Sequence, residues 1–256
     1  MRPPTGSPMP FANTPLQLLI QKLERRTQLT TEDQAALLKL DYRRRLFRAN
    51  EYIVRENERP GPCQLLIDGI AMRTKMTLDG SRQIMSLQFP GDMMDLQHLY
   101  LDHADHNLEA LTLCRVAEVE RTAVQHLMKT RPSLMRAVTI EIASEASIHR
   151  EWALNIGCRS GRARIAHLIC EFAYRTGSRD PSPDDEFILP MTQDQLGDAV
   201  AVTSIHVNRK LKELTELKLI LRPGRFKIKI LDWIGLQNEA GFNPRYLHMP
   251  RQEGSL

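Results

Sequence analysis

The sequence predicts an α+β fold: an N-terminal antiparallel β-roll, similar to a jelly roll and flanked by helices, then a long helix, then a C-terminal winged helix-turn-helix domain. Three observations predict it. Short apolar segments punctuated by Gly, Pro and Asp fill about residues 46–125, an uninterrupted helical pattern follows them, and a last helical region ends in two short strands. A chain of 256 residues has room for two modest cores, so we expect two domains.

The composition excludes several classes of protein. No run approaches the ~18–20 apolar residues that span a bilayer, and the first residues lack the apolar core of a secretory signal, so we expect a cytoplasmic protein without a membrane partner. The net charge of +4 permits a polyanionic partner. No two cysteines form a CxxC pair, which predicts buried free thiols rather than a zinc knuckle or disulfide framework. The cysteines are Cys63, Cys114, Cys158 and Cys170.

Residues 1–15 are rich in Pro and small residues and are predicted to be disordered. A first amphipathic helix follows, with apolar residues at i, i+3, i+4 and i+7. These are Leu16, Leu19, Ile20 and Leu23. Thr31 and Gln34 have the spacing of a capping box and predict a second helix. The segments LFRANEYIV and RQIMSLQF, separated by turns such as NERPGP and LDG, then indicate the strands of the β-roll.

The segment that begins RPSLMRAV continues for more than twenty residues without a helix breaker. Its apolar stripe is interrupted by Glu141, Glu145 and His149, which favours a long, partly exposed helix over a clean coiled-coil seam. The next helix is more regular, with Ile165 and Phe172 among its apolar positions. The segment RTGSRDPSPDDEF that follows is predicted to be a surface loop.

The segment AVAVTSIHVNRKL can be interpreted as a strand or as a helix end, a turn and a second helix. The second interpretation accommodates the helical sequence NRKLKELTELK, which a strand would leave unexplained. Thr192 and Thr203 cap the two helices, Gly197 lets them cross closely, and the turn falls at residues 201–202. The predicted core of this motif is Leu196, Val200, Val202, Val207 and Leu211, joined by Leu214.

The second helix has an outward face that carries Ile205, Asn208, Arg209 and Lys212. Two short strands around residues 223–225 then form a wing. Between Thr192 and Ile230, eight Lys and Arg residues stand against four Asp and Glu residues, and all eight lie on the second helix or beyond it. Such a one-sided excess is typical of a helix that docks in the major groove of DNA.

The run MTQDQLGDAVAVTSIHVNRKLKEL, followed by LI and GR before the last strand, resembles the winged helix-turn-helix of the Crp/Fnr family of bacterial transcription regulators. The upstream order is similar too: paired helices, a strand-rich region with RQIMSLQFPGDMMDL, a long helix, then GRARIAHLICEFAYR. The resemblance covers about residues 16–231. It implies an effector domain like a cyclic-nucleotide-binding domain at 16–130, a dimerisation helix at 131–157, a DNA-binding domain at 158–232 and a tail at 233–256.

The resemblance further implies a homodimer that binds an inverted repeat in double-stranded DNA, works with RNA polymerase and is not an enzyme. The implied base contacts are Ser204, Ile205, Asn208 and Arg209. The implied DNA backbone contacts are Thr192, Thr203, His206, Lys212, Arg225 and Lys227. The implied dimer interface is Leu134, Val138, Ile142, Ile148 and Trp152. Arg209 could donate two hydrogen bonds to a guanine, whereas Ile205 replaces an acidic residue and could touch a thymine methyl.

The effector region departs from members that bind cyclic AMP. Asp95 and Leu96 stand near the expected Gly-Glu, and no arginine occurs between Arg82 and Arg115. A cyclic phosphate would then have no counter-charge, so we do not expect cyclic AMP. An iron-sulfur cluster is not expected either, because no cysteine precedes Cys63. No cofactor is identifiable from the sequence.

Three alternatives remain open. His98, His103 and His106, with Glu109, could make a metal- or haem-responsive sensor, since a spacing of three would place the last three on one face of a helix; surface histidines are the simpler interpretation. A cupin-like enzyme would use such ligands, but its HxH spacing is missing. A basic wing that binds protein is a further alternative. Separately, Cys158 could act as a redox switch at a hinge.

Overall fold

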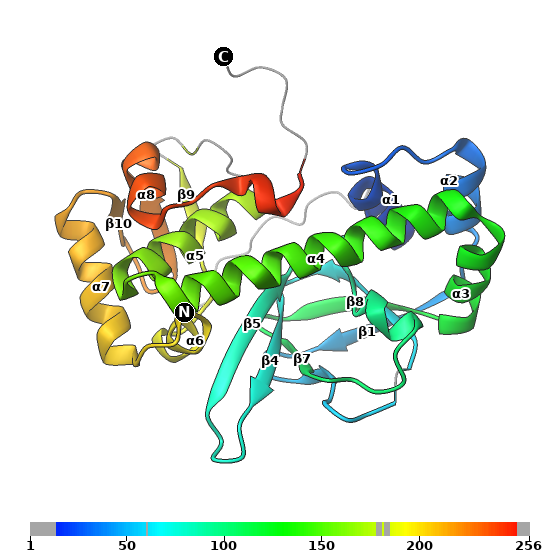
Figure 1. The fold of residues 1–256 in the computed structure, drawn as a ribbon, viewed down its shortest axis with the longest axis horizontal. Coiled ribbons are helices and arrows are strands. Elements are labelled where there is room, and N and C mark those ends of the chain that lie inside the picture. Colours follow the sequence, from blue (N-terminus) through cyan, green and yellow to red (C-terminus); the bar gives the residue numbers. More distant parts are fainter. Residues whose placement is uncertain (1–13, 60, 178–180, 182–184, 250–256) are drawn as a thin grey trace, which may run out of the picture.

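A computed structural model of the chain describes residues 14–59, 61–177, 181 and 185–249 (Figure 1). Residues 1–13, most of the segment predicted to be disordered, lie outside this part. Two four-stranded antiparallel sheets form the β-roll, with strand orders β1-β8-β3-β6 and β2-β7-β4-β5. The strands are β1 (Tyr42–Phe47), β2 (Tyr52–Val54), β3 (Cys63–Asp68), β4 (Ala71–Met76), β5 (Arg82–Gln88), β6 (Met93–Met94), β7 (Asn107–Ala110) and β8 (Cys114–Val119). The α+β fold is thus confirmed.

Three helices flank the β-roll: α1 (Pro15–Glu24), α2 (Thr31–Leu38) and α3 (Arg121–Thr130), and a short 3-10 helix, η1 (Leu96–Leu99), follows β6. The four apolar residues predicted on α1 are all buried. The capping box of α2 lies one residue earlier than predicted: Thr30 accepts a hydrogen bond from the backbone N–H of Asp33 at 3.2 Å. Thr30 caps this helix because its backbone is extended, with φ −74° and ψ 161°.

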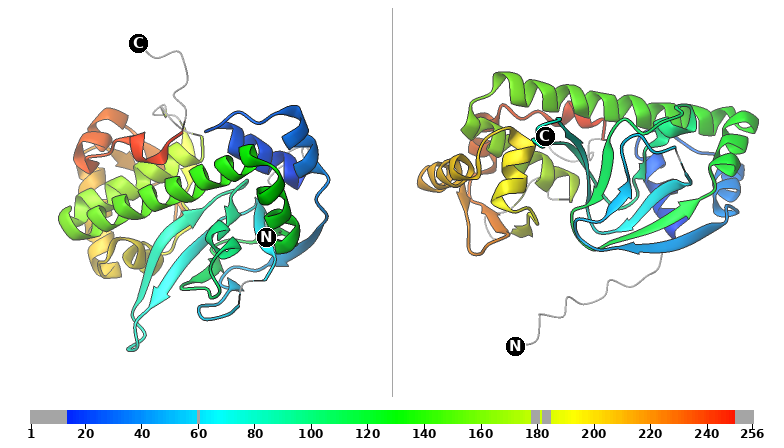
Figure 2. Two further views of the ribbon diagram at one scale, coloured as in Figure 1. Left: turned by 45° about the vertical axis from the view of Figure 1, so that its right-hand side comes forward. Right: turned by 90° about the horizontal axis from the view of Figure 1, so that it is seen from below.

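The long helix α4 (Pro132–Cys158) runs along both domains, and the views of Figure 2 place it on the outside of the molecule. Its apolar stripe faces inward. Leu134 and Val138 pack with α1, and Ile148 and Trp152 pack with the following helix; each is at most 5% exposed. The prediction that these four meet a partner subunit is wrong, because this chain already covers them. Ile142 is partly buried against the same core.

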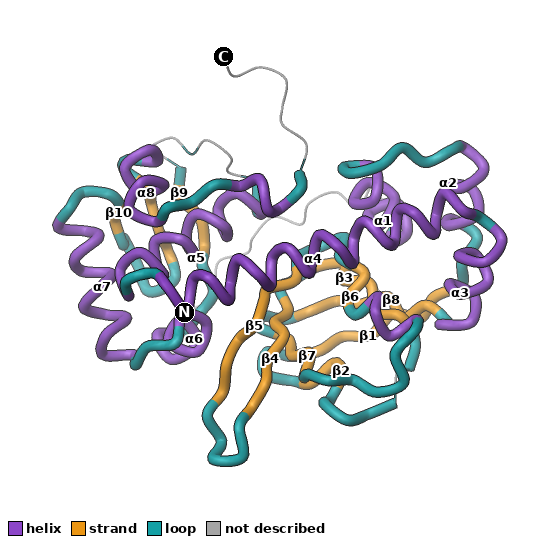
Figure 3. The backbone as a smooth tube through the Cα atoms, viewed as in Figure 1, coloured by secondary structure: helices purple, strands orange, loops and turns teal. Residues whose placement is uncertain are grey.

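The C-terminal domain contains α5 (Gly161–Arg175), α6 (Gln193–Val200) and α7 (Ser204–Glu216) (Figure 3). Its sheet has the order β10-β11-β9, formed by β10 (Ile220–Leu221), β11 (Lys227–Ile230) and β9 (Glu186–Ile188). The predicted helix-turn-helix and wing are therefore present. Two residues of the predicted surface loop, Glu186 and Phe187, instead pair with β11 as a third strand.

Residues 233–249 were expected to be part of a tail, and this prediction is wrong. They form α8 (Trp233–Ala240) and a 3-10 helix, η2 (Pro244–Leu247). Trp233, Leu236, Phe242 and Leu247 are buried in the core of the C-terminal domain, where α8 packs on α5 and η2 packs on α4. Residues 250–256 lie outside the described part. In that part, no helix combines the length and the apolar character needed to cross a bilayer.

Candidate nucleic-acid interface

The turn between α6 and α7 is built by local hydrogen bonds. Thr192 caps α6: its backbone N–H donates to Gln195 Oε1 at 2.9 Å, and its hydroxyl accepts from the N–H of Gln195 at 3.2 Å. Ala201 ends the helix in a left-handed conformation, with φ 53°. A Cβ at Gly197 would lie 2.5 Å from the carbonyl oxygen of Val202. The prediction that Gly197 permits a close crossing is confirmed.

The inner face of the motif is apolar. Val207, Leu211 and Leu214 of α7 are at most 2% exposed and belong to one cluster with Leu196 and Val200 of α6. Val202, in the turn, is partly buried against this cluster. The structure places the predicted core residues together, so the orientation of α7 is fixed by burial.

The outer face of α7 is open. Ile205 is 82% exposed, and Asn208 and Arg209 are also exposed, whereas Ser204 is half-buried at the start of the helix. Thr203 caps α7: its hydroxyl accepts from the backbone N–H of His206 at 3.4 Å and lies 2.9 Å from Nδ1 of the same residue. The predicted base-contacting residues thus share one end and one face of α7.

Ion pairs within the domain leave some cations more available than others. On α7, Lys212 lies 3.6 Å from Glu216, and at the wing Lys227 lies 3.1 Å from Glu186. Among the described residues, no carboxylate lies within ion-pair distance of Arg209 or Arg225. Arg225 stacks over the Phe226 ring at 5.0 Å. Among the cations predicted to contact DNA, the charges of these two arginines are therefore the most open to a polyanion.

The position of α7 relative to α4 determines where two copies of α7 would lie in a dimer. α5 and α7 lie at the carboxyl end of α4, on the side of the molecule away from the paired helices α1 and α2 (Figures 1 and 2). A twofold axis running along α4 would therefore place two copies of α7 at the same end of a dimer.

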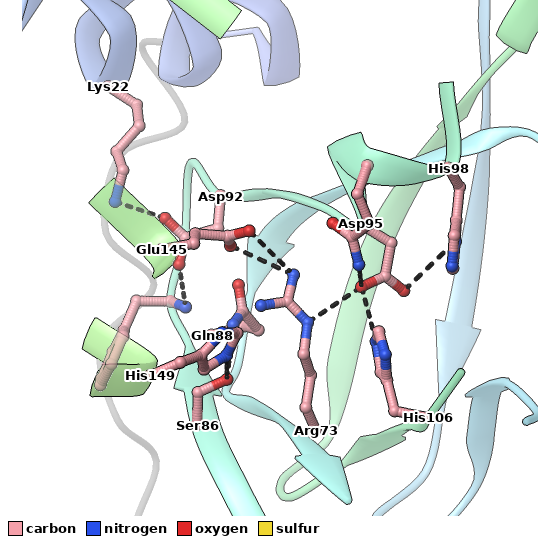
Figure 4. Close-up of polar contacts among 12 residues, drawn as sticks. Lys22, Arg73, Ser86, Gln88, Asp92, Asp95, His98, His106, Glu145 and His149 are labelled. Atoms are coloured by element: carbon pink, nitrogen blue, oxygen red, sulfur yellow. Dashed lines mark hydrogen bonds and ion pairs between the residues drawn. The ribbon is translucent and has the colours of Figure 1, made fainter. Parts of the chain in front are cut away.

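The interior of the β-roll contains a buried charge network that the sequence did not predict (Figure 4). Arg73 of β4 is 2% exposed; its Nε donates to Asp95 at 2.9 Å and its Nη2 to Glu145 of α4 at 3.1 Å. Burial raises the pKa of Asp95, but the charge of Arg73 and a hydrogen bond from His106 outweigh it and hold that pKa below its ordinary value. No local pattern of the sequence indicates this network, because Arg73, Asp95 and Glu145 come from distant segments.

Two histidines extend the network. His106 lies between two carboxylates, with Nε2 2.9 Å from Asp95 and Nδ1 2.7 Å from Asp105. Burial opposes its protonation, yet the hydrogen bond and charge of Asp95 raise its pKa above the ordinary value. On α4, burial lowers the pKa of His149 to about 4, and its Nε2 lies 3.4 Å from the hydroxyl of Ser86. Most of these groups pair with one another, although Asp95 Oδ2, His98 Nε2 and Gln88 Oε1 are buried without a hydrogen-bond partner among the described residues.

The candidate metal ligands do not come together as the helical spacing suggested. His98 stacks on His106 with ring centroids 5.9 Å apart, whereas His103 is exposed. Glu109 lies on strand β7 and accepts from the hydroxyl of Thr74. His103 and His106 lie in the loop before β7 rather than on a helix, so a spacing of three does not place them and Glu109 on one face. No group of three or more His, Cys, Asp or Glu in the described ranges is arranged to hold a metal ion.

The cysteines differ from the prediction at one position. Cys63, Cys114 and Cys170 are buried, and burial raises the pKa of the first two to about 12 and about 11. Cys158 is exposed at the last residue of α4, because the helix ends there at the surface. A redox role for Cys158 stays a hypothesis.

Comparisons with known proteins agree with this architecture. A cyclic nucleotide-binding domain model matches residues 44–131, and a Crp-like helix-turn-helix domain model matches residues 163–239. The transcriptional activator protein FnrL of Cereibacter sphaeroides is 24% identical over 82% of this chain and 85% of its own length. The nitrogen fixation regulation protein FixK of Azorhizobium caulinodans is 24% identical over 73% and 75%.

The fold has close structural counterparts. FixK2 from Bradyrhizobium japonicum superposes with a TM-score of 0.71 at 23% identity, over 78% of this chain and 97% of that one. The family consists of regulators rather than enzymes, which removes the cupin-like alternative. The two domain models in this order, the relatives and the observed helix-turn-helix together show that the chain belongs to the Crp/Fnr family of transcription regulators.

Proposed function

We propose that this regulator binds an inverted-repeat DNA site as a homodimer and reads each half-site with α7. One observation carries the proposal: α7 buries Val207, Leu211 and Leu214 while Ile205 and Arg209 project from its opposite face. This is the arrangement that a recognition helix needs to enter the major groove. A bacterial DNA regulator acts in the cytoplasm, and we include that location in the proposal.

The two subunits would meet along the outward face of α4. Thr139, Ala143, Arg150 and Ala153 are exposed on that face, and Leu154 is 46% exposed. These positions replace the interface residues expected from the sequence, four of which are buried and one of which, Ile142, is partly buried. Small side chains allow two helices to approach closely. Parallel pairing would set the two copies of α7 about 34 Å apart, one turn of DNA.

Within each half-site, Arg209 would donate to O6 and N7 of a guanine, and Ile205 would contact a thymine methyl. Ser204 and Asn208 flank them on the same face. Phosphate contacts would come from Arg225 at the wing and from Lys212 and His206 on α7, with Thr192 and Thr203 at the helix starts. Lys227 would have to exchange its ion pair with Glu186 for a phosphate, so we expect its contribution to be smaller.

The β-roll would serve as a sensory domain that does not bind cyclic AMP. Arg73, a buried cation of its interior, is already paired with Asp95 and Glu145, so it is not available to a cyclic phosphate. We identify no cofactor for this domain. Contact with RNA polymerase is part of the proposal as the means by which a bound dimer changes transcription.

Selection of DNA from a random pool by the full chain, with and without cell extract, tests the proposal. We expect enrichment of a sequence with twofold symmetry and half-site centres about one turn apart. Loss of the enriched binding at moderate salt should be steep, since phosphate contacts release counterions. Recovery of the pool without any preferred sequence would contradict DNA recognition. Enrichment of a single half-site would contradict the dimer.

A further inference from the structure

The hairpin of β4 and β5 holds the first helix of the helix-turn-helix. Arg82 and Gln83, at the start of β5, both contact the end of α6. The Nε of Arg82 donates to Asp198 Oδ2 at 2.8 Å. The side-chain amide of Gln83 donates to the carbonyl oxygens of Asp198 at 2.6 Å and Ala199 at 3.3 Å. A sensory-domain hairpin is thereby attached to the DNA-binding domain.

These contacts provide hydrogen-bond donors for backbone carbonyl groups at the carboxyl end of α6. The last four carbonyls of an α-helix have no partner within the helix. At the end of α6, Gln83 donates to two of them, and Arg164 of α5 donates to the carbonyl of Val200 at 3.2 Å. The carboxyl end of α6 is therefore capped by one side chain from each domain. The positive charge of Arg82 beside this end also complements the helix dipole.

Apolar packing continues the same junction. Ile84 and Leu87 of β5 and Met72 of β4 are at most 2% exposed and share one core cluster with Leu196 and Ala199 of α6. The hairpin and the helix are therefore packed together as well as hydrogen-bonded. Because α6 and α7 share that core, the hairpin also fixes the direction in which α7 points.

The junction leaves the DNA-facing side of α7 free. Ile205 and Arg209 remain exposed while the hairpin is docked on α6. The contact is thus arranged to orient the motif rather than to cover it. A dimer must place two copies of α7 on one face of the duplex. If the DNA-binding domain can rotate relative to the β-roll, binding has to restrict that rotation, and this cost lowers the affinity for DNA.

We propose that Arg82 and Gln83 are positioning residues for DNA recognition, which hold α6 so that α7 is presented at a fixed angle. The proposal rests on the DNA-binding function proposed above. Undocking of the hairpin would leave both domains folded but free to rotate about the end of α4. DNA affinity would then fall without any loss of base contacts.

The test measures binding of full-length variants to the selected DNA by fluorescence anisotropy. We expect Arg82→Ala, Gln83→Ala and Asp198→Ala each to weaken binding about tenfold, with Arg82→Lys close to wild type. The double variant Arg82→Ala/Asp198→Ala should be no weaker than Arg82→Ala alone, since both lack the contact between Arg82 and Asp198. Arg82→Ala also removes the 3.5 Å contact of Arg82 with Glu109, which Asp198→Ala keeps. Arg44→Ala, exposed on β1, is the matched control and should bind as wild type.

Hydrogen exchange without DNA separates this proposal from the DNA-binding function. We expect Gln83→Ala to speed exchange in α6 and at the start of β5, and to leave α1 and β8 unchanged. Wild-type affinity in all three alanine variants would overturn the positioning role. So would additive losses in the double variant, or faster exchange throughout the chain, because the latter indicates general unfolding. Failure of the wild-type protein to bind any DNA would overturn the DNA-binding function instead, whatever the exchange shows.

Discussion

The guanidinium of Arg73 lies 3.1 Å from the carboxylate of Glu145, and this ion pair joins the interior of the β-roll to the long helix α4. Arg73 and Glu145 are 72 residues apart in the sequence, and Arg73 is almost completely buried, so the pair depends entirely on the fold. It also joins the two parts of the chain through which a sensory signal would have to pass.

We expect Glu145→Ala to destabilise the protein by about 2 kcal/mol. Breaking a buried ion pair usually costs roughly 3–5 kcal/mol, but Arg73 keeps its contact with Asp95. Urea unfolding checks this value, with Glu216→Ala as the control, because Glu216 forms an exposed pair with Lys212 worth about 0.5 kcal/mol at most. Equal effects of the two substitutions would show that the buried pair does not stabilise the fold.

The pH dependence of stability should depend on His149. The folded chain keeps this ring neutral, because burial lowers its pKa to about 4, whereas the unfolded chain binds a proton below about pH 6.5. This contribution to stability is therefore present above pH 6.5 and is lost as the pH falls towards 4. We expect the loss of unfolding free energy between pH 7 and 4.5 to be smaller in His149→Gln. An identical loss in both proteins would contradict this.

Close packing at the turn gives a third prediction. Gly197→Ala would bring a methyl group 2.5 Å from the backbone oxygen of Val202, and we expect a loss of about 1–3 kcal/mol as the turn shifts. Gly157→Ala is the matched control, since Gly157 is also helical and its added Cβ would meet nothing within 4 Å. That control should be neutral or more stable by up to about 1 kcal/mol. Thermal or urea unfolding distinguishes the two outcomes.

The outward face of α4 gives a fourth prediction. Ala143→Glu places a charge at the centre of the proposed dimer interface, so we expect sedimentation to show monomers where the wild type is dimeric. Ala35→Glu, exposed on α2, should leave the wild-type state unchanged. A dimer that survives Ala143→Glu would locate the interface elsewhere on the molecule.

The features that could be predicted from the sequence are those encoded over short distances. The inner face of α7 follows from Val207, Leu211 and Leu214 at helical spacing, and Thr192 and Thr203 mark the helix starts. These signals are local, because caps and periodicity act within a few residues.

The errors arose where distant segments decide the outcome. The stripe of Leu134 and Trp152 shows that one face of α4 is buried, but the stripe is the same whether a partner or the chain itself covers it. The helix α8 is a different case, because its signal is local. Asp232 has the side chain of a helix cap, and Trp233 and Leu236 follow it at helical spacing, yet these residues were expected to be part of a tail. The network around Arg73 and the contact between Arg82 and Asp198 join residues far apart in the sequence, so no local pattern announces them.

The central claim is that α7 reads DNA through Arg209. Fluorescence anisotropy of wild type, Arg209→Ala and Arg209→Lys on the selected DNA and on a scrambled duplex tests it most directly. We predict that wild type prefers the selected DNA, that Arg209→Ala loses about 10- to 100-fold of that preference, and that it keeps the weak binding to scrambled DNA. Arg209→Lys should also lose preference, since lysine retains the charge without the paired donors. Equal preference in wild type and Arg209→Ala would contradict the account.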